Sequence, residues 1–355
     1  MKNEFIYDVP QSRVIFGAGS LKNLKAEIEA LGAKKALILC TPEQSDLAEK
    51  ISSMLGSSSV GIFPKAVMHV PIETAKEAVD VARKLGADCA IAVGGGSTTG
   101  LGKAIALEYD LPILAIPTTY AGSEMTPVYG ITENGIKKTG KDPRVLPKTV
   151  IYDPELTLSL PLEMSITSGV NAIAHAVEGL YAQNGNPIMS LLAEEGIKSL
   201  ADGLRLLKKN DQDINARSLC LYGAWLCGYV LGNVGMAIHH KLCHTLGGSF
   251  NLPHAPTHTV VLPHAVAYNE KATPEAMARV KRALGAKESS AANALFDLVN
   301  ELQGPTSLAE LGLLESDLDK ATEIALSNPY WNPEPIEKNA IRHLLQNAFE
   351  GKHPN

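Results

Sequence analysis

The sequence lacks any long hydrophobic run. No stretch of about 18 apolar residues is uninterrupted by charge, glycine or proline, so no membrane-spanning helix is predicted. It also lacks an uncharged apolar amino terminus, because Glu4 and Asp8 fall where the core of a secretory signal would lie. We therefore expect a soluble protein of the cytoplasm with no membrane partner.

Positive charge is scarce as well. The 355 residues include 32 Lys and Arg against 38 Asp and Glu, a net charge of −6, and only 20% of the residues are charged. Nucleic-acid backbones are bound by clusters of Lys and Arg, so no nucleic-acid partner is expected. A local basic pocket for a small anion remains possible, and the basic stretch 132–147 can supply a cation for it.

The cysteines show no sign of pairing. There are five, Cys40, Cys89, Cys220, Cys227 and Cys243, an odd number without CxxC spacing. Four of them lie in apolar segments typical of buried free thiols. We predict reduced cysteines with a structural role.

The first half of the chain alternates short β-branched runs with helical patterns, the signature of parallel strands joined by right-handed helical crossovers. Predicted strands cover 13–16, 35–40, 59–63, 89–93, 113–116 and 149–152, and predicted helices cover 20–31, 46–55 and 72–85. The polar, breaker-rich segment 132–147 is predicted as a hairpin or loop. This half is expected to be an α/β domain with a Rossmann-like parallel sheet.

The second half consists of long helical patterns. Predicted helices cover 186–207, 216–234, 274–284, 291–302 and 335–349. The length suits two domains, at about 150 residues each or somewhat more. We place the dinucleotide-binding α/β domain at 1–158 and an all-α domain, which carries most of the histidines, at 159–355. A cleft between two domains is the expected ligand site.

A glycine turn follows the fourth predicted strand. Gly94, Gly95 and Gly96 precede a helical pattern that starts at Ser97. Such a turn lets backbone N–H groups approach a phosphate at a helix amino terminus. It is neither a Walker A loop, because alanine follows Lys103, nor a GxGxxG turn. A diphosphate fits there, although a tight turn without a ligand has the same shape.

A second candidate loop follows the next predicted strand. It offers Thr118, Thr119 and Ser123 together with the flexible Gly122. Ligands of open α/β sheets collect at such carboxyl ends of strands. Two loops of this kind side by side favour nucleotide binding, whereas the second loop taken alone is equally typical of an ordinary polar turn.

Histidine is concentrated in one part of the second half, where six of the ten histidines lie close together. His240 and His244 are four residues apart, so both project from one face of a helix. Gly247 and Gly248 are predicted to end that helix and to return the chain to His254. Clustering of this kind calls for a chemical reason.

Asn171 and His175 repeat the i, i+4 spacing, and with His240 and His254 they can converge on one point beside His244. Three imidazoles and a carboxylate would make a convincing zinc or iron site. The fourth group is an amide, which is a poor ligand, so weak metal affinity is expected. The alternative, that these are satisfied core side chains, is favoured for three other histidines: His239, His258 and His264.

Over nearly the full chain these motifs resemble the iron-containing (group III) alcohol dehydrogenases, and within that family the maleylacetate reductase branch. The order and spacing of the motifs agree throughout. They are VIFGAGSL at 14–21, GGGS at 94–97, PTTYAGSEMTP at 117–127, TVIYDP at 149–154, NAIAHAVEG at 171–179 and HHKLCHTLGG at 239–248.

The resemblance implies a dehydroquinate synthase-like architecture and NADH or NADPH as cofactor. Many NAD-preferring relatives carry an acid after the second strand, where this chain reads Cys40-Thr41-Pro42, so we expect both cofactors to be used. The cofactor-binding residues predicted in this way are Gly94, Gly95, Gly96, Ser97, Thr118, Thr119, Ser123 and Lys138.

In metal-using members an Asp and three His bind iron or zinc, at positions that match Asn171, His175, His240 and His254. The asparagine departs from that set. It resembles the maleylacetate reductase branch, generally regarded as working without a catalytic metal, so no metal is expected. His244 matches an active-site histidine near the nicotinamide.

The implied activity is reduction of the carbon–carbon double bond of 2-maleylacetate, a small dicarboxylate, to 3-oxoadipate in the degradation of aromatic compounds. A homodimer is expected. We predict His244 as proton donor or enolate stabiliser, with His175, His240 and His254 as catalytic residues that orient the substrate and Asn171 also in contact with it. Three alternatives remain: a metal-dependent alcohol or glycerol dehydrogenase of the same family, a lyase of the dehydroquinate synthase type, and a nucleotide sensor without activity.

Overall fold

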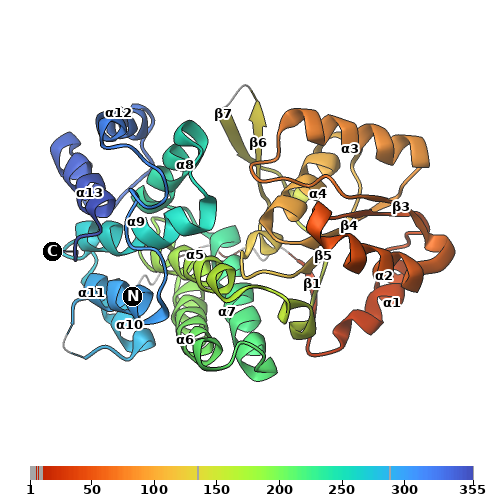
Figure 1. Ribbon diagram of the computed structural model, residues 1–355, viewed down its shortest axis with the longest axis horizontal. Coiled ribbons are helices and arrows are strands. Elements are labelled where there is room, and N and C mark those ends of the chain that lie inside the picture. Colours follow the sequence, from red (N-terminus) through yellow and green to blue (C-terminus); the bar gives the residue numbers. More distant parts are fainter. Residues whose placement is uncertain (1–4, 6, 8–10, 134–135, 288, 355) are drawn as a thin grey trace. The chain divides into compact units, whose positions relative to one another are not determined.

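The computed structural model of this chain describes residues 5, 7, 11–133, 136–287 and 289–354. They divide into two compact units (Figure 1), an α/β unit up to residue 160 and a helical unit from residue 161 onward. Tyr7 belongs to the helical unit, where its hydroxyl lies 2.9 Å from that of Tyr229. Glu4 and Asp8, which argue against an export signal, lie outside the described residues.

The α/β unit contains a six-stranded parallel sheet with the strand order β1-β8-β5-β4-β2-β3. This confirms the predicted fold class. The strands are β1 (Arg13–Phe16), β2 (Ala36–Leu39), β3 (Ser59–Phe63), β4 (Cys89–Gly94), β5 (Ile113–Pro117) and β8 (Thr149–Tyr152). Each predicted strand differs from the observed one by no more than one residue at either end. Central strands are buried on both faces, as their Val, Ile, Leu and Ala content requires.

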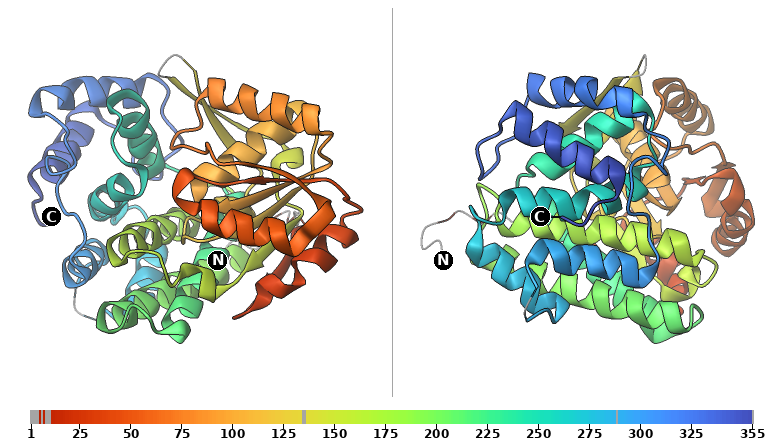
Figure 2. Two further views of the ribbon diagram at one scale, coloured as in Figure 1. Left: turned by 45° about the vertical axis from the view of Figure 1, so that its right-hand side comes forward. Right: turned by 60° about the vertical axis from the view of Figure 1, so that its left-hand side comes forward.

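Helices cover both faces of this sheet (Figure 2). They are α1 (Leu24–Ala30), α2 (Ser45–Leu55), α3 (Ile72–Leu85) and α4 (Gly96–Tyr109). On one face Ile28 of α1 and Ile51 of α2 share a core with the sheet. On the other, Val79 of α3 and Ile105 of α4 do so. A sheet packed in this way leaves its strand ends as the place where polar side chains gather.

Strands β6 (Val128–Glu133) and β7 (Ile136–Lys141) pair with each other as an antiparallel hairpin, which forms a separate two-stranded sheet. It accounts for the hairpin or loop expected at 132–147, with a first strand that begins earlier, at Val128.

The helical unit holds nine α-helices among the described residues. They are α5 (Leu162–Leu180), α6 (Pro187–Lys209), α7 (Ile214–Asn233), α8 (Ile238–Phe250), α9 (His254–Asn269), α10 (Pro274–Leu284), α11 (Ala291–Leu302), α12 (Leu318–Ser327) and α13 (Lys338–Glu350). The predicted helices correspond to α6, α7, α10, α11 and α13. Helices α9 and α12 were not predicted, and α9 contains Pro263, a residue that usually breaks a helix.

One expectation about α8 is wrong. Gly247 and Gly248 do not end this helix, which continues to Phe250 and ends at Asn251. Asn251 has φ 55°, in the left-handed region that asparagine tolerates better than most residues. The glycine pair therefore lies inside the last turns of the helix.

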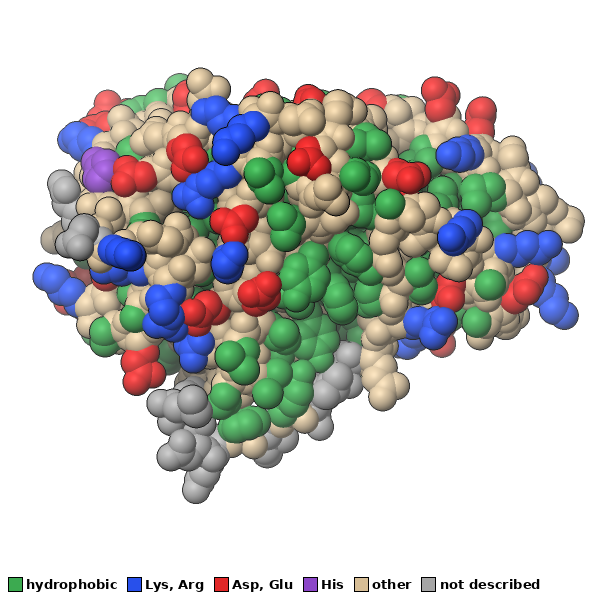
Figure 3. Space-filling model, turned by 90° about the horizontal axis from the view of Figure 1, so that it is seen from below, with side chains coloured by type: hydrophobic (Ala, Val, Ile, Leu, Met, Phe, Trp, Pro, Cys, Tyr) green, Lys and Arg blue, Asp and Glu red, His purple; other side chains and the backbone are tan. Residues whose placement is uncertain are grey.

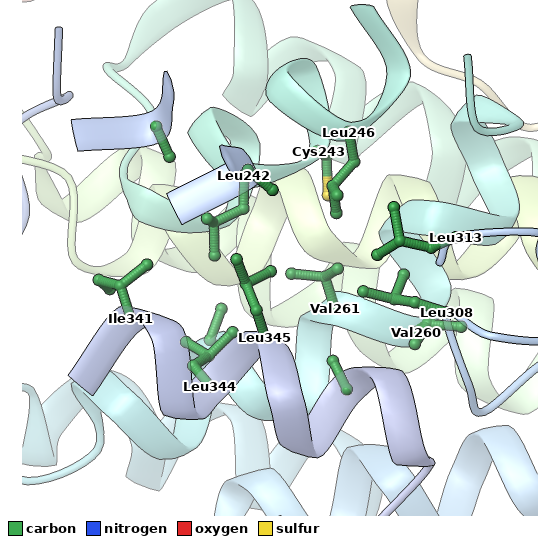
Figure 4. Packing of buried hydrophobic residues seen from close by; sticks show 14 of the residues in the cluster. Leu242, Cys243, Leu246, Val260, Val261, Leu308, Leu313, Ile341, Leu344 and Leu345 are labelled. Carbon is green, nitrogen blue, oxygen red and sulfur yellow. The ribbon is translucent and has the colours of Figure 1, made fainter. Parts of the chain in front are cut away.

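Helices α8, α9, α12 and α13 share one hydrophobic core (Figure 4). Leu242 and Leu246 of α8 lie in it with Val261 of α9 and Leu345 of α13, all nearly fully buried. This packing fixes α8 relative to α9, the two helices that carry most of the histidines.

The cysteines and the surface agree with the composition. All five cysteines are buried and free, as predicted. Among the described residues no single helix has the length and hydrophobicity of a membrane span, and α7 with α8 reaches them only across a 97° bend. On the face drawn in Figure 3, basic and acidic side chains are interspersed, and hydrophobic side chains gather in one patch.

Candidate active site

The predicted glycine turn joins β4 directly to α4. Gly94 has φ +143°, and Gly95 immediately precedes the helix. A Cβ on Gly94 would lie 2.4 Å from Oε1 of Gln44 and 2.5 Å from Oγ1 of Thr98, and one on Gly95 would lie 3.0 Å from Thr119. A larger residue does not fit at Gly94 without displacing these groups. The turn thus presents backbone N–H groups at a helix start, an arrangement suited to a phosphate.

Three buried oxygens around this turn have no hydrogen-bond partner among the described residues: Oε1 of Gln44, Oγ1 of Thr98 and Oγ of Ser123. Gln44 follows β2, and its Nε2 donates to Oγ1 of Thr118 at 2.6 Å. Strands β2 and β4 are neighbours where the strand order reverses, the usual ligand position in such sheets. Buried polar atoms without partners at that position fit a polar ligand such as a dinucleotide. Sequence analysis did not single out Gln44.

The second predicted loop lies beside the glycine turn. A Cβ on Gly96 would lie 3.8 Å from Oγ of Ser123. Thr118 is nearly fully buried and its backbone N–H donates to the carbonyl of Gly94 at 3.1 Å. The predicted cofactor residues of both loops therefore gather at one end of the sheet.

Lys103 anchors this second loop. It is 1% exposed, and its ammonium donates to the carbonyls of Ser123 and Val128 at 2.7 and 2.6 Å and to Oγ1 of Thr126 at 2.9 Å. Burial lowers its pKa to about 7. Three protein acceptors satisfy its three N–H donors, so this lysine holds the loop against α4 rather than binding phosphate.

Lys138 is placed differently from the other predicted cofactor residues. It lies on β7, its side chain is 68% exposed, and it pairs with Glu133 at 2.5 Å. Its assignment to the cofactor rests on the sequence alone.

In the helical unit three helices bring the histidines together. The ring centroid of His240 lies 5.0 Å from those of His175 and His258 and 6.1 Å from that of His244. The ring of His254 lies 4.4 Å from that of His258. The histidines predicted to converge thus form one cluster, in which His258 lies between His254 and His240.

Glu178, which sequence analysis missed, determines which histidine nitrogens in this cluster donate hydrogen bonds and which accept them. Its Oε1 accepts from the backbone N–H of His239, and its Oε2 accepts from that of Ala237, both at 2.8 Å. Oε2 also lies 2.7 Å from Nδ1 of His240. Burial raises the pKa of Glu178 to about 7, but three N–H donors on its two oxygens favour the carboxylate. Glu178 lies three residues after His175, and this spacing on α5 was the available signal.

With Glu178 ionised, the order of donors follows. His240 donates from Nδ1 to Glu178, so its Nε2 accepts from Nδ1 of His175 at 2.8 Å. Nε2 of His175 then accepts from Nδ2 of Asn171, at 3.4 Å. Burial lowers the pKa of His240 to about 3, which keeps its ring neutral. In this arrangement the N–H groups of His175 and His240 are used within the cluster.

His239 and His258, expected to be core histidines, lie against the predicted site. Nε2 of His239 is 2.9 Å from Nδ1 of His258, and both side chains are fully buried. Burial holds the pKa of both rings well below the usual value. His264 lies apart from this pair, packed against Phe296 with ring centroids 6.4 Å apart.

His244 lies at the partly exposed edge of the cluster. Its Nδ1 is 3.1 Å from the hydroxyl of Tyr330, in the segment between α12 and α13. The ammonium of Lys241 lies 5.7 Å from the centroid of the Tyr330 ring. Neither Lys241 nor Tyr330 was identified from the sequence.

The residues at the positions of the family's metal ligands do not form a metal-binding set in this arrangement. Asn171 offers a neutral amide, and its buried Oδ1 has no partner among the described residues. The facing nitrogens of His175 and His240 are hydrogen-bonded to each other. A second group of metal-type donors, His239, Cys243 and His258, lies within 4.8 Å, but burial raises the pKa of its thiol well above the usual value.

Comparison with known proteins gives the family. Residues 10–154 match "Iron-containing alcohol dehydrogenase", and residues 165–349 match "Fe-containing alcohol dehydrogenase family, C-terminal". The chain is 60% identical to maleylacetate reductase of Burkholderia cepacia, covering 99% of this chain and 100% of that protein. It is 55% identical to maleylacetate reductase of Pseudomonas sp. strain P51, covering 99% of each.

A solved structure of maleylacetate reductase from Agrobacterium tumefaciens matches with a TM-score of 0.95 at 53% identity, covering 99% of this chain and 100% of that one. A putative alcohol dehydrogenase from Ralstonia eutropha JMP134 matches with a TM-score of 0.98 at 64% identity, covering 100% of both chains. These similarities span both units. The chain belongs to the iron-containing alcohol dehydrogenase family.

Proposed function

We propose that this chain catalyses the NAD(P)H-dependent reduction of 2-maleylacetate to 3-oxoadipate. Support comes from curated relatives named maleylacetate reductase, which are 49–60% identical over 99% of the chain. The single observation that carries the proposal within the structure is the histidine cluster with Asn171 in place of a carboxylate. The enzyme is an oxidoreductase that acts on a CH–CH group.

The reaction needs a hydride donor and an acid. Bound NADH or NADPH would supply a hydride. When the alkene carbon β to the ketone accepts it, the alkene electron pair moves onto the ketone oxygen as an enolate, and the carbon α to the ketone takes up a proton. A donor to the enolate oxygen contributes about 3 kcal/mol to such a transition state. We assign this donor to His244, at the partly exposed edge of the cluster.

The other histidines have narrower roles in this proposal. His175 and His240 use their N–H groups on each other and on Glu178, so they shape the site and orient the substrate instead of donating protons. His254 and Asn171 complete the substrate-binding side. As expected from the sequence, proton donation is assigned to His244.

The cofactor is proposed to lie on the α/β unit. Gly95, Gly96 and Ser97 would hold its pyrophosphate, and Thr118 and Thr119 would lie near its adenosine side. We propose that both NADH and NADPH are accepted. Glu43, an exposed carboxylate that the sequence argument did not weigh, follows β2, and hydrogen bonding with Thr41 lowers its pKa. A preference for NADH above about a thousandfold, ~4 kcal/mol, contradicts acceptance of both.

We propose that no metal takes part in catalysis. The support is the chemistry of the donor set: a neutral amide and imidazoles whose nitrogens bond one another. Prolonged dialysis against EDTA is expected to leave turnover unchanged. A metal-dependent alcohol or glycerol dehydrogenase, the alternative, loses its activity under this treatment and regains it with zinc or iron.

The deciding experiment follows nicotinamide absorbance with NADH and freshly generated maleylacetate, with and without chelator. Consumption of NADH with formation of 3-oxoadipate is the expected result. Oxidation of NADH only with simple aldehydes, or none with any enone diacid, refutes the proposed function. A homodimer in the cytoplasm is part of the same proposal, and light scattering of the purified protein tests the dimer.

A further inference from the structure

A basic side chain stands beside the proposed proton donor. Lys241 and His244 are three residues apart on α8, so they project from adjacent positions along one side of the helix. Both side chains are partly buried. The residues that precede them on the helix, His240 and Cys243, are nearly fully buried. This side of α8 is therefore the edge at which the histidine cluster meets solvent.

Tyr330 connects the two groups. Its hydroxyl lies 3.1 Å from Nδ1 of His244, and its ring lies 5.7 Å from the ammonium of Lys241. We call these three residues the Lys241 edge. A cation over an aromatic face is attracted to it without being neutralised, so the positive charge remains available to an anion.

The segment that carries Tyr330 is tied to α9 at two residues that follow the tyrosine, Asn332 and Pro335. Asn332 and Asn269 exchange amide hydrogen bonds at 2.8 and 3.1 Å. The hydroxyl of Tyr268 donates to the carbonyl of Pro335 at 2.5 Å. These anchors hold the segment that carries the phenol against α9.

Lys241 is not among the lysines that pair with an acidic side chain. No carboxylate of the described residues lies within 4.0 Å of its ammonium. By contrast Lys138 pairs with Glu133 at 2.5 Å, and Lys198 pairs with Asp202 at 2.6 Å. Partial burial removes water from Lys241 and lowers its pKa. A partly desolvated cation without a carboxylate gains most from an anion that arrives with the ligand.

We propose that Lys241 binds one of the two carboxylates of the substrate and thereby sets the enone beside His244. The inference rests on the proposed function and goes beyond it, because it names the residue that selects dicarboxylates. The sequence pointed to the basic stretch 132–147 for such a cation, but Lys138 there is paired and lies in the α/β unit.

The test compares Lys241→Met with the unchanged protein, using inhibitors that differ by one carboxylate. The Ki values of 3-oxoadipate, 4-oxopentanoate and 3-oxohexanoate are measured against maleylacetate turnover, so the analogues need not react. In the variant we expect KM for maleylacetate and Ki for 3-oxoadipate to rise about 30-fold, ~2 kcal/mol. One of the two monoacids is expected to keep its Ki within twofold.

Three controls separate this role from a structural one. Lys241→Arg keeps the charge and is expected to restore most of the lost affinity. Lys198→Met removes an exposed, paired lysine of the same unit and is expected to change nothing. NADH affinity is expected to stay unchanged in all variants, since the proposed cofactor groups lie in the α/β unit.

Each outcome decides one proposal. If Lys241→Met raises the Ki of the diacid and of both monoacids equally, or of none, Lys241 does not bind a carboxylate. If Lys241→Met fails to fold, Lys241→Arg is compared with Lys241→Gln. Both replacements are long and polar, but only arginine carries the positive charge, so a difference in the Ki of the diacid between them supports the proposal and equal values contradict it. If the unchanged protein does not oxidise NADH with maleylacetate, the proposed function fails instead.

Discussion

The two units of this chain prepare for their ligands by different physical means. In the α/β unit the proposed cofactor meets backbone N–H groups and small side chains around Gly94, Gly95 and Gly96, at the end of a rigid parallel sheet. In the helical unit the proposed substrate meets large polar rings supplied by separate helices and ordered by one buried carboxylate, Glu178. Backbone recognition needs a local motif, whereas side-chain recognition needs helices far apart in sequence to pack together.

The largest effect is expected from the helical unit. His244→Ala should lower kcat about 100-fold, ~3 kcal/mol, because the developing enolate loses its donor. NADH affinity, measured by fluorescence titration, should stay within twofold. His343→Ala, which removes an exposed histidine on α13, is the matched control and should be neutral. Unchanged turnover in His244→Ala removes this residue from the mechanism.

The glycine turn offers the converse test in the α/β unit. Gly94→Ala forces a Cβ against Gln44 and Thr98 and places alanine at φ +143°. NADH affinity should fall about 30-fold, ~2 kcal/mol, through strain and displacement of the groups around the cofactor. A Cβ in Gly102→Ala, on the helix α4 that follows the turn, meets its nearest atom at an ordinary 3.5 Å, and this variant should bind NADH normally. Equal affinities in the two variants would mean that the turn does not hold the cofactor.

A smaller effect is expected at Tyr330. Tyr330→Phe keeps the ring over Lys241 but removes the hydroxyl that orients His244, so kcat should fall about tenfold, ~1.4 kcal/mol. The pH profile of kcat should shift as well, which mere loosening of the segment does not produce. Tyr268→Phe removes the other hydroxyl that anchors this segment and should leave kcat nearly unchanged. A similar loss of kcat in both variants would mean that the Tyr330 hydroxyl only holds the segment in place.

The smallest effect concerns stability. Burial raises the pKa of Glu178 from 4.5 to about 7, so between these values the folded protein binds more protons than the unfolded chain. Stability contributed by this group is therefore present below pH 4.5, falls as pH rises to about 7, and is constant above it. Glu178→Gln should flatten this slope in urea unfolding at pH 5 to 8, even if its absolute stability is lower. An identical slope in both proteins contradicts the raised pKa.

The difference between the units also explains which predictions the sequence allowed. Strand β8 was located to the residue because burial on both faces favours a continuous apolar run, here Val150 and Ile151. The prediction that Gly247 and Gly248 end α8 failed because a helix ends where a residue enters the left-handed region. Here that residue is Asn251, and tertiary packing determines its position.

The candidate site divides in the same way. The glycine turn and the i, i+4 pairs of Asn171 with His175 and of His240 with His244 were legible because helix and strand geometry act over a few residues. Glu178 was within reach of that argument, three residues after His175. His258 was as well, four residues after His254 on α9. Tyr330 was not, because nothing local to this residue indicates its distant partner, His244.

The sequence by itself determined the alternation of strands and helices, the chemistry available at the glycine turn, and the presence of imidazoles without the expected carboxylate. Only the tertiary structure decided which nitrogen of His240 faces Glu178, that His258 separates His254 from His240, and that Lys241 stands beside His244 without a carboxylate. The physical reason is range: propensity and periodicity act along the chain, whereas hydrogen-bond direction and desolvation depend on which helices pack together.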